Sequence, residues 1–259
     1  MLENSNFEIE KVINHGNSAI VFEATEKDTK KSYAIKKSLP NPICGNYFFH
    51  NEIKIMKLIT PHLNCVKFFD HWEYNKHIVL QIELCDGTLL DLIYGGNISI
   101  SNVWHILLDI GFGIEHIHRQ NVVHLDLKPE NILVSNNRFK IGDFGLALRL
   151  PVDTDDPELH VGDRKYVALE VLEDNIISKP ADVFSFGMII LHIISTGDLP
   201  NRGDNWLKIR NGDLSQFTFK VDSQDLINLT KGMIKKEIKE RQTIKEIIIH
   251  IIKFIYEQI

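Results

Sequence analysis

The chain has 259 residues, of which 44% are hydrophobic, so it can bury a full core as one domain or as two closely joined lobes. A total of 29 Lys and Arg against 35 Asp and Glu gives a net charge of -6, and no long basic run is present, so we expect no broad surface for nucleic acid. The three cysteines are far apart and form no C-x-x-C pair, which predicts reduced thiols in an intracellular protein.

Neither end of the chain has the pattern of a targeting or membrane-spanning segment. The first residues, MLENSNFEIE, lack a charged stretch followed by an apolar one. Residues 244–259 are the most apolar stretch, but Lys245, Glu246 and Lys253 interrupt it well short of the ~20 apolar residues that a spanning helix needs. We therefore expect a soluble protein whose last residues form a core helix.

The pattern in the first third of the chain predicts a small sheet and one helix. Short runs rich in Val, Ile, Phe and Tyr alternate with turn residues, as strands do. Residues 51–59 differ, because Ile53, Met56 and Ile59 recur at helical spacing. The expected strands are residues 7–13, 19–25, 32–38, 66–74 and 77–84.

Long helices dominate from residue 101 onward. Residues 101–118 place Val103, Ile106 and Ile110 on one stripe, as an amphipathic helix does. Residues 180–195 are apolar on nearly all sides, as expected of a buried helix. Because runs of strands precede runs of helices, the sequence predicts an α+β fold with two segregated lobes.

Four groups of residues occur in the order that a phosphoryl-transfer site requires. A short strand ends in Lys36, and Glu52 lies on the helix that follows it. HLDLKPEN at residues 124–131 is similar to the catalytic loop H-R-D-x-x-x-x-N of protein kinases, and Asp-Phe-Gly follows at residues 143–145. Each group alone is a weak signal, but the ordered set resembles a protein kinase across essentially the whole chain.

The resemblance implies a two-lobed protein kinase fold that uses ATP and Mg²⁺. A small, mainly-β N-lobe with one main helix would occupy residues 1–84. The hinge and a larger, mainly-α C-lobe would occupy residues 85–259. The two lobes together would form a single kinase domain over residues 1–259.

The same resemblance assigns roles in catalysis. Lys36, paired with Glu52, would bind the α- and β-phosphates of ATP. Asp126 would accept the proton of the substrate hydroxyl, and Lys128 would neutralise the transferred phosphate. The expected magnesium ligands are Asn131 and Asp143.

Nucleotide binding would involve a hinge, a phosphate loop and apolar residues on either side of adenine. The hinge follows Ile82, the expected gatekeeper, and would bond adenine through backbone groups. The phosphate loop departs from G-x-G-x-x-G-x-V, because Gly16 is the one glycine of three that remains, which predicts weaker ATP binding or a stiffer loop. The expected nucleotide-binding residues are Asn14, His15, Gly16, Val21, Ala34, Lys36, Ile82, Glu83, Cys85 and Leu133.

The resemblance also places supporting residues around the site. His124 would stack under Phe144 rather than act in catalysis. Asp182 would anchor the catalytic loop from below. Glu170 and Arg241 would form a buried ion pair that ties the activation segment to the late helices.

Further stretches narrow the family. Residues 199–214, LPNRGDNWLKIRNGDL, match L-P-x-x-G-x-x-W-x-x-I/L-R-x-G-x-L, and Asp163 of VGDRKY replaces a threonine of many serine/threonine kinases. Together with Leu125 in place of arginine and QIELC at residues 81–85, these features resemble the Wee/Myt family of mitosis-inhibitory kinases. The resemblance implies phosphate transfer to a tyrosine, and in the Myt branch also to the neighbouring threonine, in the phosphate loop of a cyclin-dependent kinase.

The expected partner is therefore a cyclin-dependent kinase with its cyclin, which would be held inactive so that mitosis is delayed. We expect a monomer in the nucleus or the cytoplasm that binds no nucleic acid and has no membrane segment in this chain. One alternative is a divergent serine/threonine kinase with other substrates. Another is a pseudokinase that serves as a binding module, which the depleted phosphate loop favours and the complete set of catalytic residues opposes.

Leu125 also predicts activity without phosphorylation of the activation segment. Where an arginine stands at this position, it binds a phosphate on that segment. Thr154 is the single serine or threonine between residues 146 and 167, and it stands among aspartates. We expect the Asp163 carboxylate to pair with Lys128 and to hold the segment open in place of the missing threonine contact.

Overall fold

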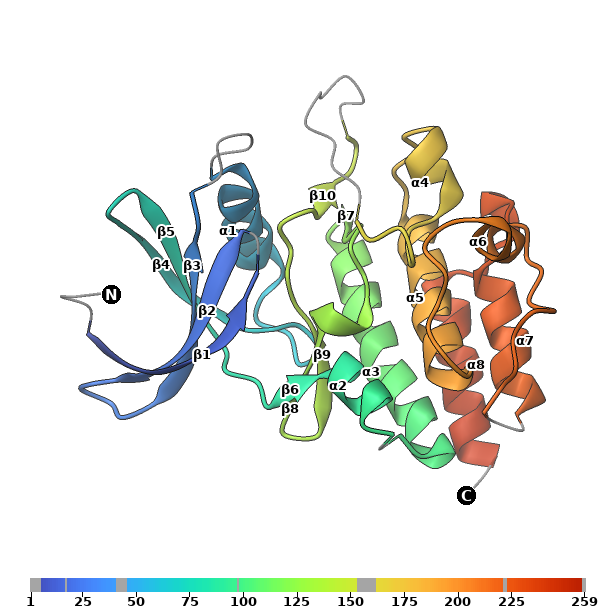
Figure 1. Ribbon diagram of the computed structural model, residues 1–259, viewed down its shortest axis with the longest axis horizontal. Helices are drawn as coiled ribbons and strands as arrows, with labels where there is room; N and C mark the ends of the chain where they lie inside the picture. The colour runs from blue at the N-terminus through green and yellow to red at the C-terminus, as the bar shows by residue number, and fades with distance from the viewer. Residues whose placement is uncertain are drawn as a thin grey trace.

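The computed structural model describes residues 6–16, 18–40, 46–96, 98–152, 162–220 and 223–257, without the side chains of residues 100 and 101. Cys44 and Thr154 lie outside these ranges. The described chain forms a small lobe of strands with one helix and a larger lobe of helices (Figure 1). The predicted α+β fold with two lobes is thereby confirmed.

A five-stranded antiparallel sheet forms the small lobe, in the order β1-β2-β3-β5-β4. The sheet is apolar on both faces, because Ala24, Ile35 and Val79 form a separate cluster while Leu80 belongs to the main core. All five predicted strands form, each within two residues of its expected ends. The strands are Phe7–His15 (β1), Ala19–Glu26 (β2), Ser32–Ser38 (β3), Phe68–Tyr74 (β4) and His77–Ile82 (β5).

Helix α1, Tyr47–Ile59, packs beside this sheet (Figure 1). It brings a carboxylate into the core. Phe49, Ile53 and Met56 are buried at helical spacing, and Glu52 lies among them. The helix starts four residues before the predicted position 51. The prediction followed aliphatic residues, whereas the aromatic ring of Phe49 extends the same buried stripe toward the N-terminus.

The larger lobe is built around helix α5, Lys179–Ile194 (Figure 1). Every side chain from Ala181 to Ile194 is buried, which accounts for the apolar composition on all sides of this helix. Helix α7 packs on α5, and α8 packs on α3. The other helices are Leu89–Tyr94 (α2), Ile100–Arg119 (α3), Leu169–Glu173 (α4), Asp204–Arg210 (α6), Gln224–Met233 (α7) and Ile244–Glu257 (α8).

Helix α8 confirms the prediction of a core helix in the last residues. Ile244, Ile247, Ile248 and Ile251 are buried on one side of it. Among the helices that the structure describes, none is both long enough and apolar enough to cross a membrane.

Short strands between the lobes carry the loops on which the candidate site lies. The strands β8 and β9 form a hairpin whose turn residues, Asn136 and Asn137, both have positive φ, which asparagine tolerates better than most residues. The loop at residues 124–131 connects β7 to β8, and Asp143 follows β9. The strands are Gly87–Thr88 (β6), Val122–Val123 (β7), Ile132–Ser135 (β8), Arg138–Ile141 (β9) and Leu148–Arg149 (β10).

Candidate active site

Three charged side chains from three elements meet at the centre of the site. Lys36 of β3 donates from Nζ to both carboxylate oxygens of Glu52, at 2.8 Å each, and to Asp143 Oδ1 at 3.1 Å. The Lys36 and Glu52 side chains are 12% and 3% exposed, whereas that of Asp143 is 50% exposed. The lysine is therefore fixed from inside by Glu52 and is presented to the open side together with Asp143.

The protonation of this cluster follows from its charges. Burial by itself would lower the pKa of Lys36, but the carboxylates of Asp143 and Glu52 outweigh it and raise the pKa above its usual value. The Lys36 charge in turn lowers the pKa of Asp143. At neutral pH the lysine is therefore a cation and Asp143 is an anion, which is the state that can hold phosphate and metal.

Asp143 is aimed by the residues around it. Its φ of 59° lies in the left-handed region, which Asp adopts more readily than most residues. The next residue, Phe144, is fully buried, and its ring lies 5.0 Å from that of His124, in contact as predicted but tilted by 58° and not stacked. Because the ring of Phe144 is buried in the core, the carboxylate of Asp143 before it faces the cavity.

The catalytic-loop candidates form one hydrogen-bonded group around Asp126. Asp126 Oδ2 accepts from Lys128 Nζ at 2.8 Å and from Asn131 Nδ2 at 3.0 Å. Asp126 Oδ1 accepts from the backbone N–H of Asp163 at 3.1 Å. The carboxylate therefore has one orientation, and Oδ1 keeps lone-pair capacity for a further donor.

Asp182 of α5 supports this loop from inside the large lobe, as predicted. Its carboxylate accepts from the backbone N–H of His124 at 2.9 Å and from that of Leu125 at 3.0 Å. It also bonds the ring of His118 at 2.9 Å. Leu125 has φ 65°, a strained conformation for a leucine, and is 4% exposed. At this position the structure thus buries an apolar side chain beside anchored backbone.

The predicted pairing of Asp163 with Lys128 is wrong. Lys128 is held by Asp126, while Asp163 Oδ1 accepts from the backbone N–H of Lys165 at 2.8 Å. The carbonyl of Asp163 also accepts from the N–H groups of Tyr166 and Val167. The Asp163 carboxylate closes a local turn because the backbone N–H two positions further along the chain is nearer to it than the Lys128 side chain is.

The donor set at the mouth of the site suits a magnesium ion. Asn131 Nδ2 donates to the carbonyl and the carboxylate of Asp126, so Asn131 Oδ1 is left for a ligand. Asp143 adds a carboxylate, and both are hard oxygen donors of the kind that Mg²⁺ prefers. Within the described residues no group of three or more His, Cys, Asp or Glu could form a metal cage. One or two protein ligands completed by phosphate oxygens are the usual arrangement for this ion.

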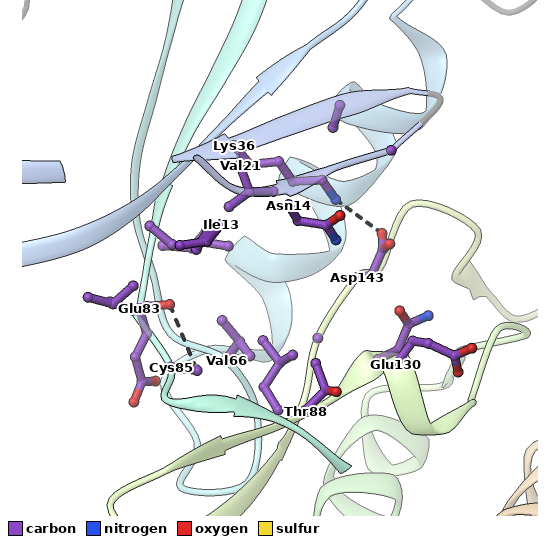
Figure 2. A pocket seen from close by; sticks show the side chains of 18 of the residues that line it. Ile13, Asn14, Val21, Lys36, Val66, Glu83, Cys85, Thr88, Glu130 and Asp143 are labelled. Atoms are coloured by element: carbon purple, nitrogen blue, oxygen red, sulfur yellow. Dashed lines mark hydrogen bonds and ion pairs between the residues drawn. The ribbon is translucent and has the colours of Figure 1, made fainter. Parts of the chain in front are cut away.

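A cavity of about 770 Å³ lies between the lobes, within the size range of small-molecule sites. Figure 2 shows Lys36 and Asp143 approaching each other at one side of it, with Glu83 and Cys85 on another. His15 is exposed and does not line this cavity. The predicted residues that line it are Asn14, Gly16, Val21, Ala34, Lys36, Glu52, Ile82, Glu83, Cys85, Asn131, Leu133 and Asp143.

The expected hinge has backbone groups available for a ligand. The Glu83 N–H donates to Lys67 O, and the Asp86 N–H donates to Val134 O. Between them, the backbone N–H and C=O of Cys85 make no hydrogen bond within the described part of the chain. Since such groups are normally paired, Cys85 can bond a planar heterocycle through its main chain.

The structure also brings in residues that the sequence analysis missed. Asn51, next to Glu52, donates from Nδ2 to Gly145 O at 2.9 Å and to Ala147 O at 2.8 Å. It thereby joins α1 to the first turn after Asp143. An isolated asparagine on a helix gives no sequence signal of such a contact, because its acceptors are main-chain atoms more than 90 positions away.

The far end of the activation segment is tied down as predicted. Glu170 and Arg241 form a two-pronged ion pair, with Arg241 Nη2 to Glu170 Oε2 at 2.9 Å, and both residues are 7% exposed. Arg241 also donates to the carbonyls of Lys235, Lys236 and Pro180. This ion pair therefore fixes helix α4 to the loop before α8.

Comparison with known proteins identifies this arrangement. The sequence profile of the protein kinase domain matches residues 7–252, so the chain belongs to the protein kinase family. Within that family it has mitosis-inhibitory kinases of the Wee type as homologues, at 34% to 36% identity over most of the chain.

Three relatives illustrate the similarity. The membrane-associated tyrosine- and threonine-specific cdc2-inhibitory kinase wee-1.3 of Caenorhabditis elegans is 34% identical over 94% of this chain and 36% of its own length. The mitosis inhibitor protein kinase wee1 of Schizosaccharomyces pombe is 36% identical over 75% of this chain and 23% of its own length. The mitosis inhibitor protein kinase SWE1 of Candida albicans is 36% identical over 79% and 19%. The chain thus spans about a third of the length of these curated relatives, or less.

Proposed function

We propose that this chain transfers the γ-phosphate of ATP to a tyrosine in the phosphate loop of a cyclin-dependent kinase, with the adjacent threonine as a possible second acceptor. The transfer would inhibit the partner, bound to its cyclin, and delay mitosis. The observation that carries the proposal is the joining of Lys36 to both Glu52 and Asp143 on the wall of the cavity. This closed ion-pair arrangement is the one in which protein kinases are competent for transfer.

The residues of the site divide the work of phosphoryl transfer. Lys36, directed by Glu52, binds the α- and β-phosphates, and the Cys85 main chain bonds adenine. Asn131 and Asp143 would hold Mg²⁺, which would offset the charge of the phosphates. Asp126 orients the substrate hydroxyl and takes its proton through Oδ1 as the new oxygen–phosphorus bond forms and the bond from the γ-phosphorus to the β-phosphate oxygen breaks, so that ADP leaves. We assign Lys128, whose Nζ lies 2.8 Å from Asp126 Oδ2, to offset the charge of the transferred phosphate.

The choice of substrate is supported by the relatives. The nematode relative is named for tyrosine- and threonine-specific inhibition of cdc2, and the two fungal relatives are named mitosis inhibitors. We extend this role to the present chain, as one kinase domain over residues 1–259 with lobes at residues 1–84 and 85–259. We place it in the nucleus or the cytoplasm.

The experiment is mapping of phosphorylation sites by mass spectrometry. A catalytically inactive cyclin-dependent kinase bound to cyclin is incubated with this protein and magnesium ATP, and the Asp126→Asn variant is the control. We expect phosphate on the phosphate-loop tyrosine with the wild type and none with the variant. Phosphate confined to scattered serines and threonines would leave a protein kinase of another specificity, and no transfer to any substrate would favour a pseudokinase.

A further inference from the structure

The tryptophan and arginine of residues 199–214 have no part in the chemistry above, yet both point at the activation segment. Trp206 and Arg210 lie four positions apart on helix α6, so they share one face of it. Both are buried, at 5% and 1% exposure, whereas Lys208 between them is exposed. The face that they form packs against residues 164–167.

Within the part of the chain that the structure describes, the hydrogen bonds from these two side chains go to main-chain carbonyls of that segment. Trp206 Nε1 donates to Arg164 O at 2.7 Å. Arg210 Nη2 lies 2.7 Å from Arg164 O, 3.1 Å from Lys165 O and 3.0 Å from Val167 O. A single guanidinium thus binds three carbonyls of one turn. It fixes the path of the backbone there through main-chain atoms, whatever side chains the segment carries.

Arg210 is an unusual cation, because it has no carboxylate partner among the described residues. Its guanidinium lies over the ring of Trp206 at 4.1 Å and over that of Phe184 at 5.5 Å. Burial, together with the neighbouring charge of Arg164, lowers the pKa of Arg210 to about 9, so the side chain is still charged at neutral pH. Carbonyl dipoles and aromatic faces therefore take the place of a counter-ion.

The segment that Arg210 holds is in direct contact with the catalytic loop. The backbone N–H of Asp163 donates to Asp126 Oδ1 at 3.1 Å. A Cβ added to Gly162 would collide with Leu125 O and with the Asp126 carboxylate, so the two backbones lie against each other here. A continuous set of contacts thus runs from α6 through residues 162–167 to the proposed catalytic base.

We propose that Trp206 and Arg210 are positioning residues that hold residues 162–167 in the shape that receives the protein substrate, in place of a phosphorylated activation segment. The inference rests on the proposed phosphotransfer function and adds a means of keeping the site assembled. Leu125 is apolar, so the catalytic loop offers no cation at that position to a phosphate on the segment. The cation that orders the segment comes instead from α6, and it acts on the main chain.

The choice of arginine follows from geometry. The planar guanidinium of Arg210 lies over the indole ring of Trp206 and directs Nη2 at three carbonyls, whereas a lysine ammonium is a point charge on a flexible stem that cannot stack in this way. The Arg210→Lys variant should therefore keep the charge but lose the clamp, by which we mean the contacts of Trp206 and Arg210 with the carbonyls of residues 164–167. This difference separates a positioning role from a mere need for a buried cation.

The decisive measurement is hydrogen–deuterium exchange of the peptide that contains residues 162–167, which needs no enzymatic activity. We expect Arg210→Met to speed exchange there about tenfold or more, because the carbonyl contacts that close the turn are lost. The exchange rate of Arg210→Lys should fall between those of Arg210→Met and the wild type, and Trp206→Phe should increase the rate less than Arg210→Met does. Lys208→Met, the same type of change on the exposed side of α6, should leave exchange unaltered.

Kinetics then separate positioning from loss of fold. With Arg210→Met we expect KM for the protein substrate to rise about tenfold and kcat to fall, while ATP binding by thermal shift stays within about twofold. Equal losses in substrate and ATP binding, or exchange that rises throughout the large lobe, would indicate a general packing role and overturn the proposal. If Arg210→Met does not fold, Arg210→Lys and Trp206→Phe decide, and wild-type behaviour of both overturns it.

The two proposals fail in different ways. A wild-type protein that ignores the cyclin-dependent kinase refutes the proposed substrate, and kinetics of the clamp variants then use whichever peptide it does phosphorylate. A wild-type protein without any transferase activity refutes the proposed function, but the exchange measurement still has an outcome. Unchanged exchange of residues 162–167 in Arg210→Met refutes the clamp in either case.

Discussion

At the scale of single residues, the charged groups of the site are each held in one direction by a named partner. Lys36 is fixed by Glu52, and Asp126 is fixed by Lys128, Asn131 and the Asp163 amide. Such fixed groups need little reorganisation when charge moves in the transition state. Substitutions that keep shape but change basicity therefore test chemistry rather than folding.

Asp126→Asn is the first such test. The amide keeps the size of the carboxylate but cannot take the substrate proton, so kcat should fall about 10²- to 10⁴-fold with little change in ATP affinity. Initial-rate kinetics and thermal shift with ATP measure the two quantities. Glu173→Gln, a matched change at an exposed position on α4, serves as the control. A kcat within about tenfold of the wild type would remove Asp126 from the role of base.

The thiols of Cys65 and Cys85 give a test by pH. Burial raises the pKa of both to about 12 from 9.0, and for Cys85 the charge of Glu83 adds to the effect. The folded protein should therefore hold about a thousandfold less thiolate at these sites than the unfolded chain at pH 8, and alkylation should speed up as pH rises. Site-resolved mass spectrometry after iodoacetamide measures this, with the urea-unfolded chain as reference. Equal rates in both states would contradict the raised pKa of these thiols.

At the scale of elements, the site depends on helices that approach one another closely. Helix α5 carries Asp182 to the catalytic loop, and Gly187 of α5 lies against α7. A Cβ added to Gly187 would lie 2.7 Å from Ile234 Cγ2 and 2.9 Å from Met233 Cβ. These are closer than packed atoms tolerate, so the glycine is required by the contact between helices.

Gly187→Ala should therefore destabilise the protein by about 1–2 kcal/mol, since the clash outweighs the gain in helix propensity. Gly111→Ala on α3 is the matched change, because its added Cβ meets Ile248 Cγ1 at 3.1 Å and its next neighbour at 3.8 Å. We expect a smaller loss for it. Urea unfolding of both variants measures the free energies, and a Gly187→Ala variant as stable as the wild type would refute the packing argument.

At the scale of the whole molecule, the candidate site exists only where the two lobes meet. Lys36 and Glu52 come from the small lobe, whereas Asp126 and Asn131 lie in the loop between β7 and β8 and Asp143 follows β9, on the large-lobe side. A ligand that contacts both sets stabilises their association. Nucleotide binding should thus be visible as a change in global stability.

Magnesium ATP should raise the unfolding midpoint, by a stabilisation of about 2.7 kcal/mol at a hundredfold excess over Kd. In Asp143→Asn, ATP should still raise the unfolding midpoint slightly, but the further rise that depends on magnesium should be lost, because the ion loses a carboxylate ligand. Thermal shift with ATP in magnesium or in EDTA makes the comparison, and Asp174→Asn is the control. The same increment in EDTA as in magnesium, for the wild type, would argue against a metal at this site.

The sequence by itself determined the five main strands, the long helices and the identity of the charged residues around the site. These features depend on local periodicity and on residue types in a fixed order, which can be read without knowing how the chain folds back. Even there, α1 began earlier than expected, because Phe49 extends a stripe that the aliphatic pattern did not include.

Only the tertiary structure decided which of those residues touch. The direction of the Asp163 carboxylate, the hold of Asn51 on Gly145 and the hold of Arg210 on Arg164 all depend on main-chain atoms whose positions no residue pattern records. The last two join positions 94 and 46 residues apart. A hydrogen bond to a backbone carbonyl places no demand on the identity of the residue that offers it, so the sequence motif included Arg210 but gave no sign of the residues that it holds.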